Sequence, residues 1–300
     1  MYLKIEKTIV TVGSFDGVHR GHRVLLRRVV ELAQQNSLKS VAITFHPHPR
    51  QTLDSSGDAP LLLNTFDERI SLLKQTGVDK VVVLPFDKAL AQMSAHDFVK
   101  KIIIEKFNAQ YIVVGQDHHF GKERGGDVQR LLDFSVQNDL RVEIVDLKNI
   151  EQKISSSAIR EALMNGNLTL ANDMLGYRYV ISGKVIGGNQ LGRTIGFPTA
   201  NVEPPECKLI PKGGVYRVKV KTGSDELERL GMMYIGKRSI LKNDGESVNI
   251  EANIFDFDQQ VYGQEIALTL THRIRDDKKF DNIEQLSEQL HRDKQKIMTI

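Results

Sequence analysis

Short apolar runs alternate with segments of helical spacing through the first half of the chain. The apolar runs are rich in β-branched residues and suit buried strands at 8–12, 40–45, 80–84, 111–114 and 141–145. Helical patterns lie between these runs, near 22–35, 65–75, 94–107 and 126–138. Continuous apolar strands that alternate with helices predict an α/β fold, with a parallel, doubly wound sheet covered on both faces. Two of the helices begin with capping-box spacing, Thr65 with Glu68 and Ser94 with Asp97.

The apolar period changes to two in the second half of the chain. Apolar side chains alternate with polar ones in several segments, as at 216–221 and 266–271. Strands of this kind, separated by turns that contain glycine and asparagine, predict a small antiparallel β-barrel. A last helical pattern near 282–298 follows the strands, so we expect a terminal helix.

Two short helical patterns, at 158–163 and 168–175, precede the change of period. We therefore expect two domains, at 1–176 and 177–300. A chain of 300 residues is long enough for two domains of ordinary size. Its hydrophobic content of 40% and charged content of 26% fit a soluble globular protein.

Charge and cysteine content exclude several classes of protein. The formal net charge is only +3 and opposite charges are intermixed, so charge alone indicates no polyanion-binding surface. A single cysteine, Cys207, excludes an internal disulfide and a cysteine-built metal site. The sequence shows neither an apolar run of membrane-spanning length nor a leader with a basic start and an apolar core. We expect a cytoplasmic protein without a membrane partner.

Residues 11–22 form a strand-to-helix turn that contains two histidines. His19 and His22 are three apart at the helix start, beside free backbone N–H groups and the positive end of the helix dipole. Phosphate oxygens can be held there. Gly21 removes a side chain where a triphosphate must approach the backbone, and Gly17 permits a turn with positive φ. The alternative is a surface helix start that happens to contain two histidines.

Polar residues also follow the other predicted strands, at the sheet edge where parallel sheets bind ligands. Pro47 and Pro49 stiffen a loop that can form a flat wall for a ring system, although a simple rigid turn explains them equally well. Ser155 and Ser156 can cap a helix, and Arg160 turns the same helix start into an anion site for a leaving pyrophosphate. Zinc is not expected, because no acidic or cysteine partner at ligand spacing accompanies the histidines of these loops, His46, His48, His118 and His119.

A glycine-rich stretch at 183–202 is the informative part of the second half. Its glycines leave N–H groups free to line a phosphate-binding concavity, although a plain loop is the commoner cause of such a pattern. These glycines are Gly187, Gly188, Gly192 and Gly196. The stretch lacks the Gly-Lys-Thr/Ser of a Walker loop. Thr199 and Asn201 supply two hard oxygens of the type that Mg²⁺ prefers, with room for water and substrate phosphates.

The string Gly-Ser-Phe-Asp-Gly-Val-His-Arg-Gly-His at 13–22 resembles the adenylyltransferase module of bacterial bifunctional riboflavin kinase/FAD synthetases. That module belongs to the nucleotidyltransferase superfamily with a His-x-Gly-His signature. The resemblance continues through the Pro-His-Pro loop, the Pro-Phe-Asp segment before Met93-Ser94, the Val-Val-Gly-x-Asp-x-x-Phe-Gly loop and the Ile-Ser-Ser-x-x-Ile-Arg helix start. His46 replaces a frequent glutamate and His118 a frequent phenylalanine.

This resemblance implies three groups of site residues. Charge on the α-phosphate and pyrophosphate would be stabilised by His19, His22 and Arg160. ATP would also contact Gly13, Phe15, Gly21, Ser155 and Ser156. Flavin would contact Pro47, Pro49 and Asp117.

Residues 183–202 resemble the riboflavin kinase signature through the segment Gly-Phe-Pro-Thr-Ala-Asn. The match continues through Gly214-Val215-Tyr216, Ile250-Glu251, Phe255-Asp256-Phe257, Tyr262-Gly263 and Arg275 with Phe280. It implies that Thr199 and Asn201 hold Mg²⁺ and that Glu251 is the base for the riboflavin 5′-hydroxyl. Without the resemblance, Glu251 would be an exposed strand carboxylate. Contacts to ATP or flavin would come from Gly188, Gly192, Gly196 and Arg275.

The chain departs from the kinase pattern at a few positions. Tyr234 stands where asparagine is common, Ser239-Ile240 replaces a frequent Pro-Thr, and Gly187 and Asn253 each replace a frequent histidine. The magnesium pair and the base match the pattern.

The resemblance implies an enzyme with two activities. The barrel would transfer the γ-phosphoryl of ATP to riboflavin, giving FMN, and the α/β domain would transfer AMP from ATP to FMN, giving FAD and pyrophosphate. One alternative is an adenylyltransferase whose barrel binds flavin without efficient phosphorylation, which the departures favour. Another is a nucleic-acid-binding protein, but the chain lacks a basic stripe with interleaved aromatics.

Overall fold

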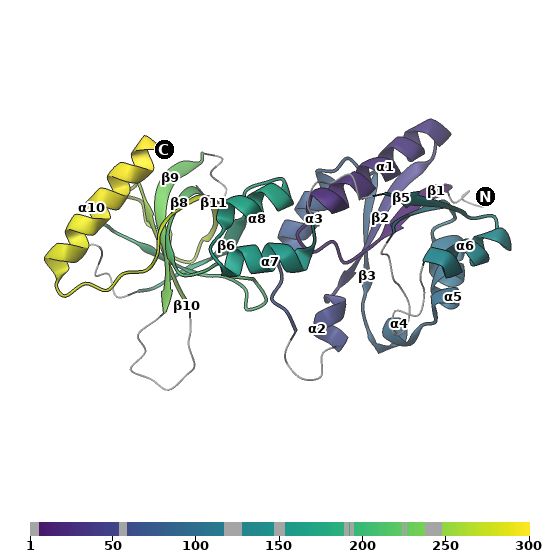
Figure 1. Cartoon of the computed structure of the whole chain (residues 1–300), viewed down its shortest axis with the longest axis horizontal. Helices are drawn as coiled ribbons and strands as arrows, with labels where there is room; N and C mark the ends of the chain where they lie inside the picture. The colour runs from purple at the N-terminus through teal and green to yellow at the C-terminus, as the bar shows by residue number, and fades with distance from the viewer. Residues whose placement is uncertain are drawn as a thin grey trace. The chain divides into compact units, whose positions relative to one another are not determined.

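The computed structural model describes residues 6–53, 59–116, 128–146, 154–188, 192, 195–223, 225, 227–237 and 248–300 (Figure 1). The chain divides into two compact units, Met1–Ser156 and Ser157–Ile300. The short helices α7 (Ser156–Met164) and α8 (Leu168–Leu175) therefore lie almost wholly in the second unit. The domain boundary expected at residue 176 stays a prediction.

The first unit contains a five-stranded parallel sheet with the order β3-β2-β1-β4-β5. Its strands are β1 (Thr8–Val12), β2 (Lys39–His46), β3 (Lys80–Pro85), β4 (Ala109–Gly115) and β5 (Arg141–Val145). The chain winds from β1 to one side and then returns to place β4 on its other side. The carboxyl ends of β1 and β4 thus form the topological switch point, where sheets of this kind bind ligands. The predicted doubly wound α/β sheet is confirmed.

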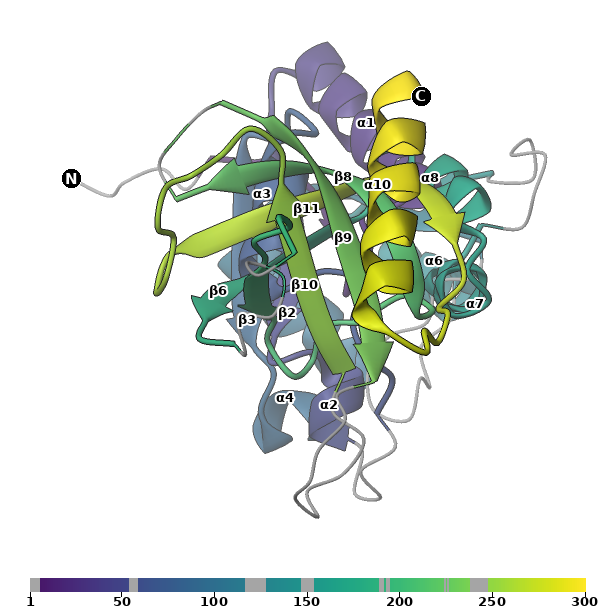
Figure 2. The same cartoon turned by 90° about the vertical axis from the view of Figure 1, so that its left-hand side faces the viewer.

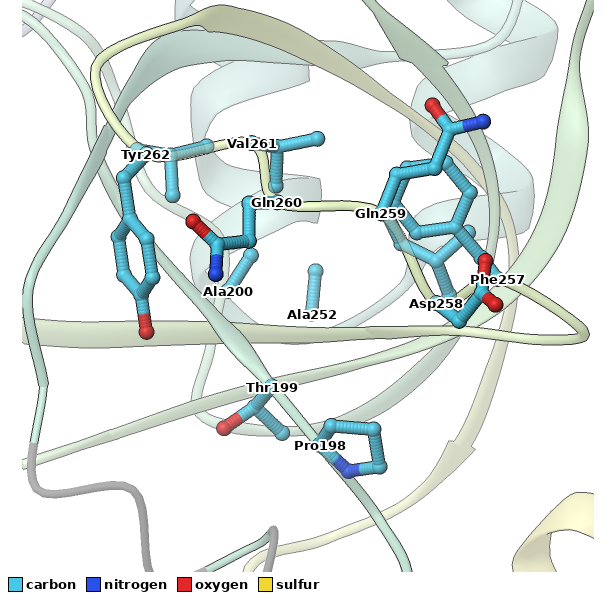
Figure 3. Close-up of a pocket in the computed structure, with 12 residues that line it drawn as sticks. Pro198, Thr199, Ala200, Ala252, Phe257, Asp258, Gln259, Gln260, Val261 and Tyr262 are labelled. Carbon is cyan, nitrogen blue, oxygen red and sulfur yellow. The ribbon is translucent and has the colours of Figure 1, made fainter.

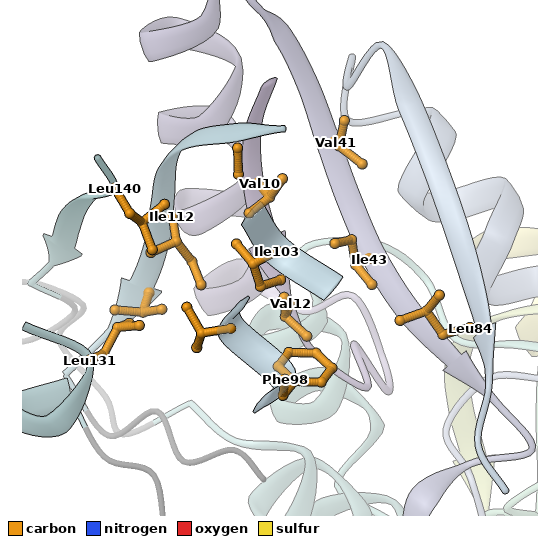
Figure 4. Close-up of a cluster of buried hydrophobic side chains, with 13 residues drawn as sticks. Val10, Val12, Val41, Ile43, Leu84, Phe98, Ile103, Ile112, Leu131 and Leu140 are labelled. Carbon is orange, nitrogen blue, oxygen red and sulfur yellow. The ribbon is translucent and has the colours of Figure 1, made fainter. Parts of the chain in front are cut away.

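Helices cover both faces of this sheet. The helices α1 (Arg20–Asn36) and α3 (Phe66–Lys74) pack over one face. The other face carries α6 (Val128–Val136) and a π-helix, η1 (Phe98–Lys106). Figure 4 shows this second core, with strand residues such as Val12 beside Phe98. Because side chains alternate along a strand, Ile9 enters one core and Val10 the other.

The start of α3 is capped as the sequence predicts. Glu68 N–H donates to Thr65 Oγ1 at 3.2 Å, and Thr65 N–H donates to Glu68 Oε2 at 2.9 Å. The helix predicted at 94–107 forms in two pieces instead, α5 (Ala95–Asp97) followed by η1. Sequence periodicity did not predict two further short helices, α2 (Pro49–Leu53) and α4 (Lys88–Gln92).

The second unit contains a closed antiparallel barrel with the order β10-β7-β6-β11-β8-β9, as predicted. Its strands are β6 (Val180–Ile186), β7 (Ala200–Glu203), β8 (Gly214–Thr222), β9 (Arg229–Lys237), β10 (Val248–Ile254) and β11 (Glu265–Arg275). On β8, Val218 and Val220 are buried while Lys219 and Lys221 are exposed, so the predicted alternation is present. Every helix in the described ranges is too short or too polar to cross a bilayer.

The terminal helix α10 (Ile283–Thr299) packs against β9 and β11 of the barrel (Figure 2). Arg275 on β11 donates through Nε to both carboxylate oxygens of Asp293, at 2.8 and 3.1 Å. The Asp293 side chain is only 4% exposed. A buried ion pair therefore joins this helix to the barrel.

Removal of that carboxylate should destabilise the second unit. Asp293→Ala leaves the Arg275 charge partly buried without its partner, and we expect it to lower the free energy of unfolding by about 3 kcal/mol or more. Urea unfolding measures the change. Glu288→Ala is the matched control, because its pair with Arg292 lies on the same helix with both side chains 68% exposed. The control should cost at most about 1 kcal/mol. Equal losses in the two variants would contradict a structural role for the buried pair.

Candidate active sites

The two histidines of the turn after β1 lie against each other at the start of α1. His19 is the N-cap residue, and its Nδ1 accepts the N–H of His22 at 3.3 Å. The two rings stack with centroids 3.6 Å apart and an interplanar angle of 15°. Phe15 packs edge-on against His22, with centroids 5.3 Å apart. The predicted pair therefore shares one place at the switch point of the sheet.

The backbone before His19 follows an unusual path. Phe15 and Val18 have φ values of 50° and 36°, in the left-handed region that a β-branched residue rarely adopts. Gly17 has a φ of 88°, which confirms the predicted positive φ. Val18 N–H donates to the Phe15 carbonyl at 3.0 Å and closes the turn. Surrounding contacts must stabilise this path, because such residues cost about 1 to 3 kcal/mol each.

Asp16 provides one set of these contacts. It is 2% exposed, and its Oδ1 accepts the N–H groups of Leu63 at 2.9 Å and Asn64 at 3.3 Å. Its carbonyl accepts the hydroxyl of Ser156 at 2.8 Å. The turn is thereby attached both to the segment before α3 and to the first residue of α7.

Arg69 of α3 provides a second set. It is 3% exposed, and its guanidinium donates to the Ser14 carbonyl at 3.0 Å and to the Phe45 carbonyl at 2.7 Å. Ser14 follows β1, and Phe45 lies near the end of β2. One side chain therefore links the ends of the two strands. Sequence reasoning missed Asp16 and Arg69. The available signal was a charge at Arg69, four residues before Leu73, on the buried side of the helix.

Burial keeps both histidines neutral at neutral pH. It lowers the pKa of His19 from 6.5 to about 4. It also lowers the pKa of His22 well below 6.5, and the neighbouring His19 adds to this shift. His22 Nδ1 is buried and makes no hydrogen bond among the described residues. Since a neutral imidazole still donates one N–H, and a nearby anion favours its protonated form, the pair suits the binding of phosphate oxygens.

The other residues predicted for this site differ in what they contact. A Cβ at Gly13 would press on the Phe15 ring at 3.1 Å, and one at Gly21 would press on the His19 ring at 3.2 Å. Phe15 is only 1% exposed, so it supports the His22 ring from within the core. Pro47 and Pro49 lie in the loop after β2, where Pro49 begins α2.

The remaining predicted residues of the first site belong to later segments. Ser155 precedes α7, and Arg160 lies one turn into that helix with 9% exposure. Asp117 lies outside the described residues, as do His118 and His119. The roles of Ser155, Arg160 and Asp117 stay predictions.

In the barrel, the two residues predicted to bind Mg²⁺ lie beside the glutamate predicted to act as the base. The antiparallel register of β7 and β10 places Asn201 opposite Glu251. The Thr199 hydroxyl donates to Glu251 Oε2 at 3.3 Å, and the Asn249 amide donates to Glu251 Oε1 at 2.6 Å. Thr199, Asn201 and Glu251 therefore form one oxygen-rich cluster, although Glu251 is 52 residues from Thr199 in the chain.

Two glycines allow the chain to approach this cluster closely. A Cβ at Gly188 would overlap the Asn201 amide, and one at Gly192 would overlap the Phe197 carbonyl. Gly196 has a φ of 77°, whereas a Cβ at Gly187 would meet no atom within 4 Å. Close packing therefore explains two of the four predicted glycines. Their contact with phosphate stays a prediction.

Two cavities meet at Thr199. The first, of about 370 Å³, lies between residues 257–262 above and Ala200 and Ala252 below, as Figure 3 shows. The second, of about 340 Å³, is lined by Asn201 and Glu251 and extends to α10. Thr199 lines both cavities. The oxygen cluster thus borders two separate spaces that could hold two substrates.

Several predicted or unusual residues border the second cavity. Arg275 lines it while it also binds Asp293. Asn253 donates to the Pro198 carbonyl at 2.7 Å and so fixes the residue before Thr199. The Tyr234 hydroxyl donates to Asp277 Oδ1 at 3.1 Å. Ser239 and Ile240 lie outside the described residues.

The fold and the two sites define a nucleotidyltransferase-type sheet and a flavokinase-type barrel in one chain. A family model described as FAD synthetase matches residues 3–158, and one described as riboflavin kinase matches residues 175–300. The chain belongs to the family of bifunctional riboflavin kinase/FMN adenylyltransferases.

Curated relatives match nearly the whole chain. A Bacillus subtilis (strain 168) protein named bifunctional riboflavin kinase/FMN adenylyltransferase is 36% identical over 97% of this chain and 92% of its own length. Its namesake from Escherichia coli (strain K12) is 35% identical over 96% of this chain and 91% of its own length. A crystal structure from Streptococcus pneumoniae, titled macrolide-efflux protein, superposes with a TM-score of 0.87 at 35% identity and covers 97% of this chain and 93% of that one.

The lowered pKa of His19 makes the stability of the first unit depend on pH. The folded-state pKa of about 4 lies below the ordinary value of 6.5. Between these two pH values the unfolded chain therefore binds a proton at His19 that the folded chain does not bind. The free energy of unfolding should fall as pH drops from 6.5 towards 4, by about 3 kcal/mol for this group. His19→Asn, which preserves an N-capping side chain, should lose that part of the pH dependence.

Urea unfolding at neutral pH and at a series of lower values measures this effect. His96→Asn, at an exposed histidine of the same unit, is the control. If His19→Asn and the parent lose stability in parallel as pH falls, His19 is not the group responsible.

Proposed function

We propose that this chain makes both flavin cofactors. The barrel phosphorylates riboflavin with ATP to give FMN, and the sheet unit transfers AMP from a second ATP to FMN to give FAD and pyrophosphate. One observation supports this most directly: the chain carries both a stacked histidine pair at the switch point of a sheet and an oxygen cluster between two cavities of a barrel. Each matches the chemistry of one step.

Riboflavin fits the cavity beside α10. Glu251 lines this cavity, and a base must reach the 5′-hydroxyl that it deprotonates. Phe197, Met232 and Phe280 give the cavity an apolar lining that suits a flat ring system. ATP is then assigned to the other cavity, so that its γ-phosphoryl group meets the hydroxyl near Thr199.

The kinase step needs one base and one cation. Glu251 accepts the proton of the 5′-hydroxyl, the oxygen bonds to the γ-phosphorus, and the bond from the γ-phosphorus to the bridging oxygen breaks to release ADP. Thr199 and Asn201 would hold Mg²⁺, since two neutral hard oxygens leave room for phosphate oxygens and water. The ion would neutralise phosphate charge.

The adenylyltransferase step needs no base, because the FMN phosphate is already an anionic nucleophile. Its oxygen bonds to the α-phosphorus of ATP, and the bond to the β-phosphate oxygen breaks to release pyrophosphate. His19 and His22 donate N–H groups to the phosphates at the positive end of α1. We assign the pyrophosphate to Arg160, Ser155 and Ser156, the approach of ATP to Gly13, Phe15 and Gly21, and the flavin to Pro47, Pro49 and Asp117.

Incubation with riboflavin, ATP and Mg²⁺, followed by chromatographic separation of FMN and FAD, tests both activities. Both products should form. FAD from supplied FMN without FMN from riboflavin would favour an adenylyltransferase whose barrel only binds flavin. Formation of neither product would overturn the proposal.

His22→Ala should abolish FAD formation and preserve FMN formation, because His22 and the base Glu251 belong to separate compact units. Loss of the ring removes a donor to the reacting phosphates, which should lower the rate by about 10²-fold or more. The rates of FMN formation from riboflavin and FAD formation from supplied FMN are measured on one preparation. FMN formation is the internal control for folding. Loss of both activities in a folded protein would contradict the separation of the sites.

Glu251→Gln should lower FMN formation by about 10²-fold or more, because it removes the base but keeps the shape. The glutamine oxygen can still accept the Asn249 amide, and its NH2 group can donate to the Thr199 hydroxyl, so ATP and riboflavin binding should change little. FAD synthesis from supplied FMN should continue. Glu203→Gln, at an exposed carboxylate on the neighbouring strand β7, is the matched control. If Glu251→Gln makes FMN at the parent rate, Glu251 is only a strand carboxylate.

A further inference from the structure

The cavity beside α10 has two walls from different parts of the chain. One wall comes from the barrel strands and includes Tyr234 and Glu251. The other comes from the segment 276–282, which connects β11 to α10 and contributes Asp277 and Phe280. The relative position of these walls determines how a flat ligand lies beside Glu251.

Tyr234 reaches from the barrel wall to the connecting segment. It lies opposite Glu251 in the register of β9 and β10. Its hydroxyl donates to Asp277 Oδ1 at 3.1 Å, and the same oxygen accepts the N–H of Lys278 at 2.8 Å. Asp277 therefore joins the phenol to the backbone of the connecting segment.

The strand is built to hold the phenol in this direction. A Cβ at Gly236, two residues further along the same face of β9, would overlap the Tyr234 ring and hydroxyl. Burial, Asp277 and Glu251 raise the pKa of Tyr234 to about 12, so the hydroxyl keeps its proton at neutral pH and stays a donor. The position is therefore suited to a persistent hydrogen bond between the walls.

We propose that Tyr234 is a positioning residue for riboflavin, and that its hydrogen bond to Asp277 fixes the segment 276–282 at the distance from Glu251 that the flavin requires. The inference rests on the proposed kinase function. Without the bond, the wall that carries Phe280 is free to shift away from Glu251, and riboflavin is held less closely to the base. Tyr234 and Asp277 do not line the other cavity, so ATP binding stays unchanged. This assigns a role to the tyrosine at a position where the kinase pattern commonly has asparagine.

Tyr234→Phe removes the hydroxyl and keeps the ring over Gly236. The lost hydrogen bond to a carboxylate should raise both the Kd of riboflavin, measured by flavin fluorescence, and its KM by about tenfold. The KM of ATP and the formation of FAD from supplied FMN should match the parent. A purely structural tyrosine would not change the riboflavin constants while leaving those of ATP unaltered.

The partner residue supplies the matched variants. Asp277→Ala should raise the riboflavin constants as Tyr234→Phe does, and the double variant should be no weaker than either, because all three lack the same bond. Asp277→Asn keeps an acceptor oxygen and should stay close to the parent. Additive losses in the double variant, or unchanged riboflavin constants in Tyr234→Phe, would overturn the inference.

The Kd and the KM of riboflavin, together with FMN formation by the parent, separate this inference from the proposed function. If the parent binds riboflavin but makes no FMN, the kinase proposal fails. A higher riboflavin Kd in Tyr234→Phe than in the parent would then still support the role of the tyrosine in the cavity. If the parent makes FMN and both riboflavin constants of Tyr234→Phe equal those of the parent, the kinase proposal stands and the role of Tyr234 is wrong.

Discussion

The first site depends on buried polar contacts that hold the turn after β1 in a path its own sequence does not favour. Left-handed backbone at Phe15 and Val18 costs about 1 to 3 kcal/mol for each residue. The two bonds from the Arg69 guanidinium to backbone carbonyls each contribute about 1.5 to 3 kcal/mol, which is enough to offset that strain. Because Arg69 belongs to α3, the position of the histidines at the start of α1 depends on this helix.

The same burial that positions the histidines makes them neutral. A protonated pair with centroids 3.6 Å apart would repel, and desolvation disfavours each charge further. Under the proposed function, the incoming triphosphate supplies the missing negative charge, and the site then gains the electrostatic stabilisation it lacks when empty.

Local periodicity explains why the fold could be predicted from the sequence. The strands, the barrel alternation and the capping box at Thr65 each depend on residues within a few positions of one another. The partners of Asp16 and Arg69 could not be found in this way, because Leu63 and Ser14 are 47 and 55 residues distant from them. Their bonds also go to backbone groups, which leave no mark in the sequence.

The glycines show a second limit of sequence reasoning. The sequence indicates their positions, and it predicts that a phosphate approaches the backbone at Gly21 and Gly188. The structure shows that each of these glycines also has a protein neighbour: Gly21 lies against the His19 ring, and Gly188 lies against the Asn201 amide. A glycine marks a close approach, but the sequence does not say which atoms approach it. Here the approaching atoms belong to proposed site residues, so close packing against those side chains is one reason for each glycine.

In the barrel, successive side chains of β7 and β10 point to opposite faces of the sheet, and the two proposed substrates lie on these opposite faces. Ala200 and Ala252 face the cavity assigned to ATP, while Asn201 and Glu251 face the cavity assigned to riboflavin. Small side chains on the first side leave space for a nucleotide, and oxygens on the second side provide the base and a ligand for the cation. Thr199, at the entrance to β7, borders both spaces. A phosphoryl group that passes from one substrate to the other must therefore pass the Thr199 hydroxyl, which already contacts the carboxylate proposed to remove the proton.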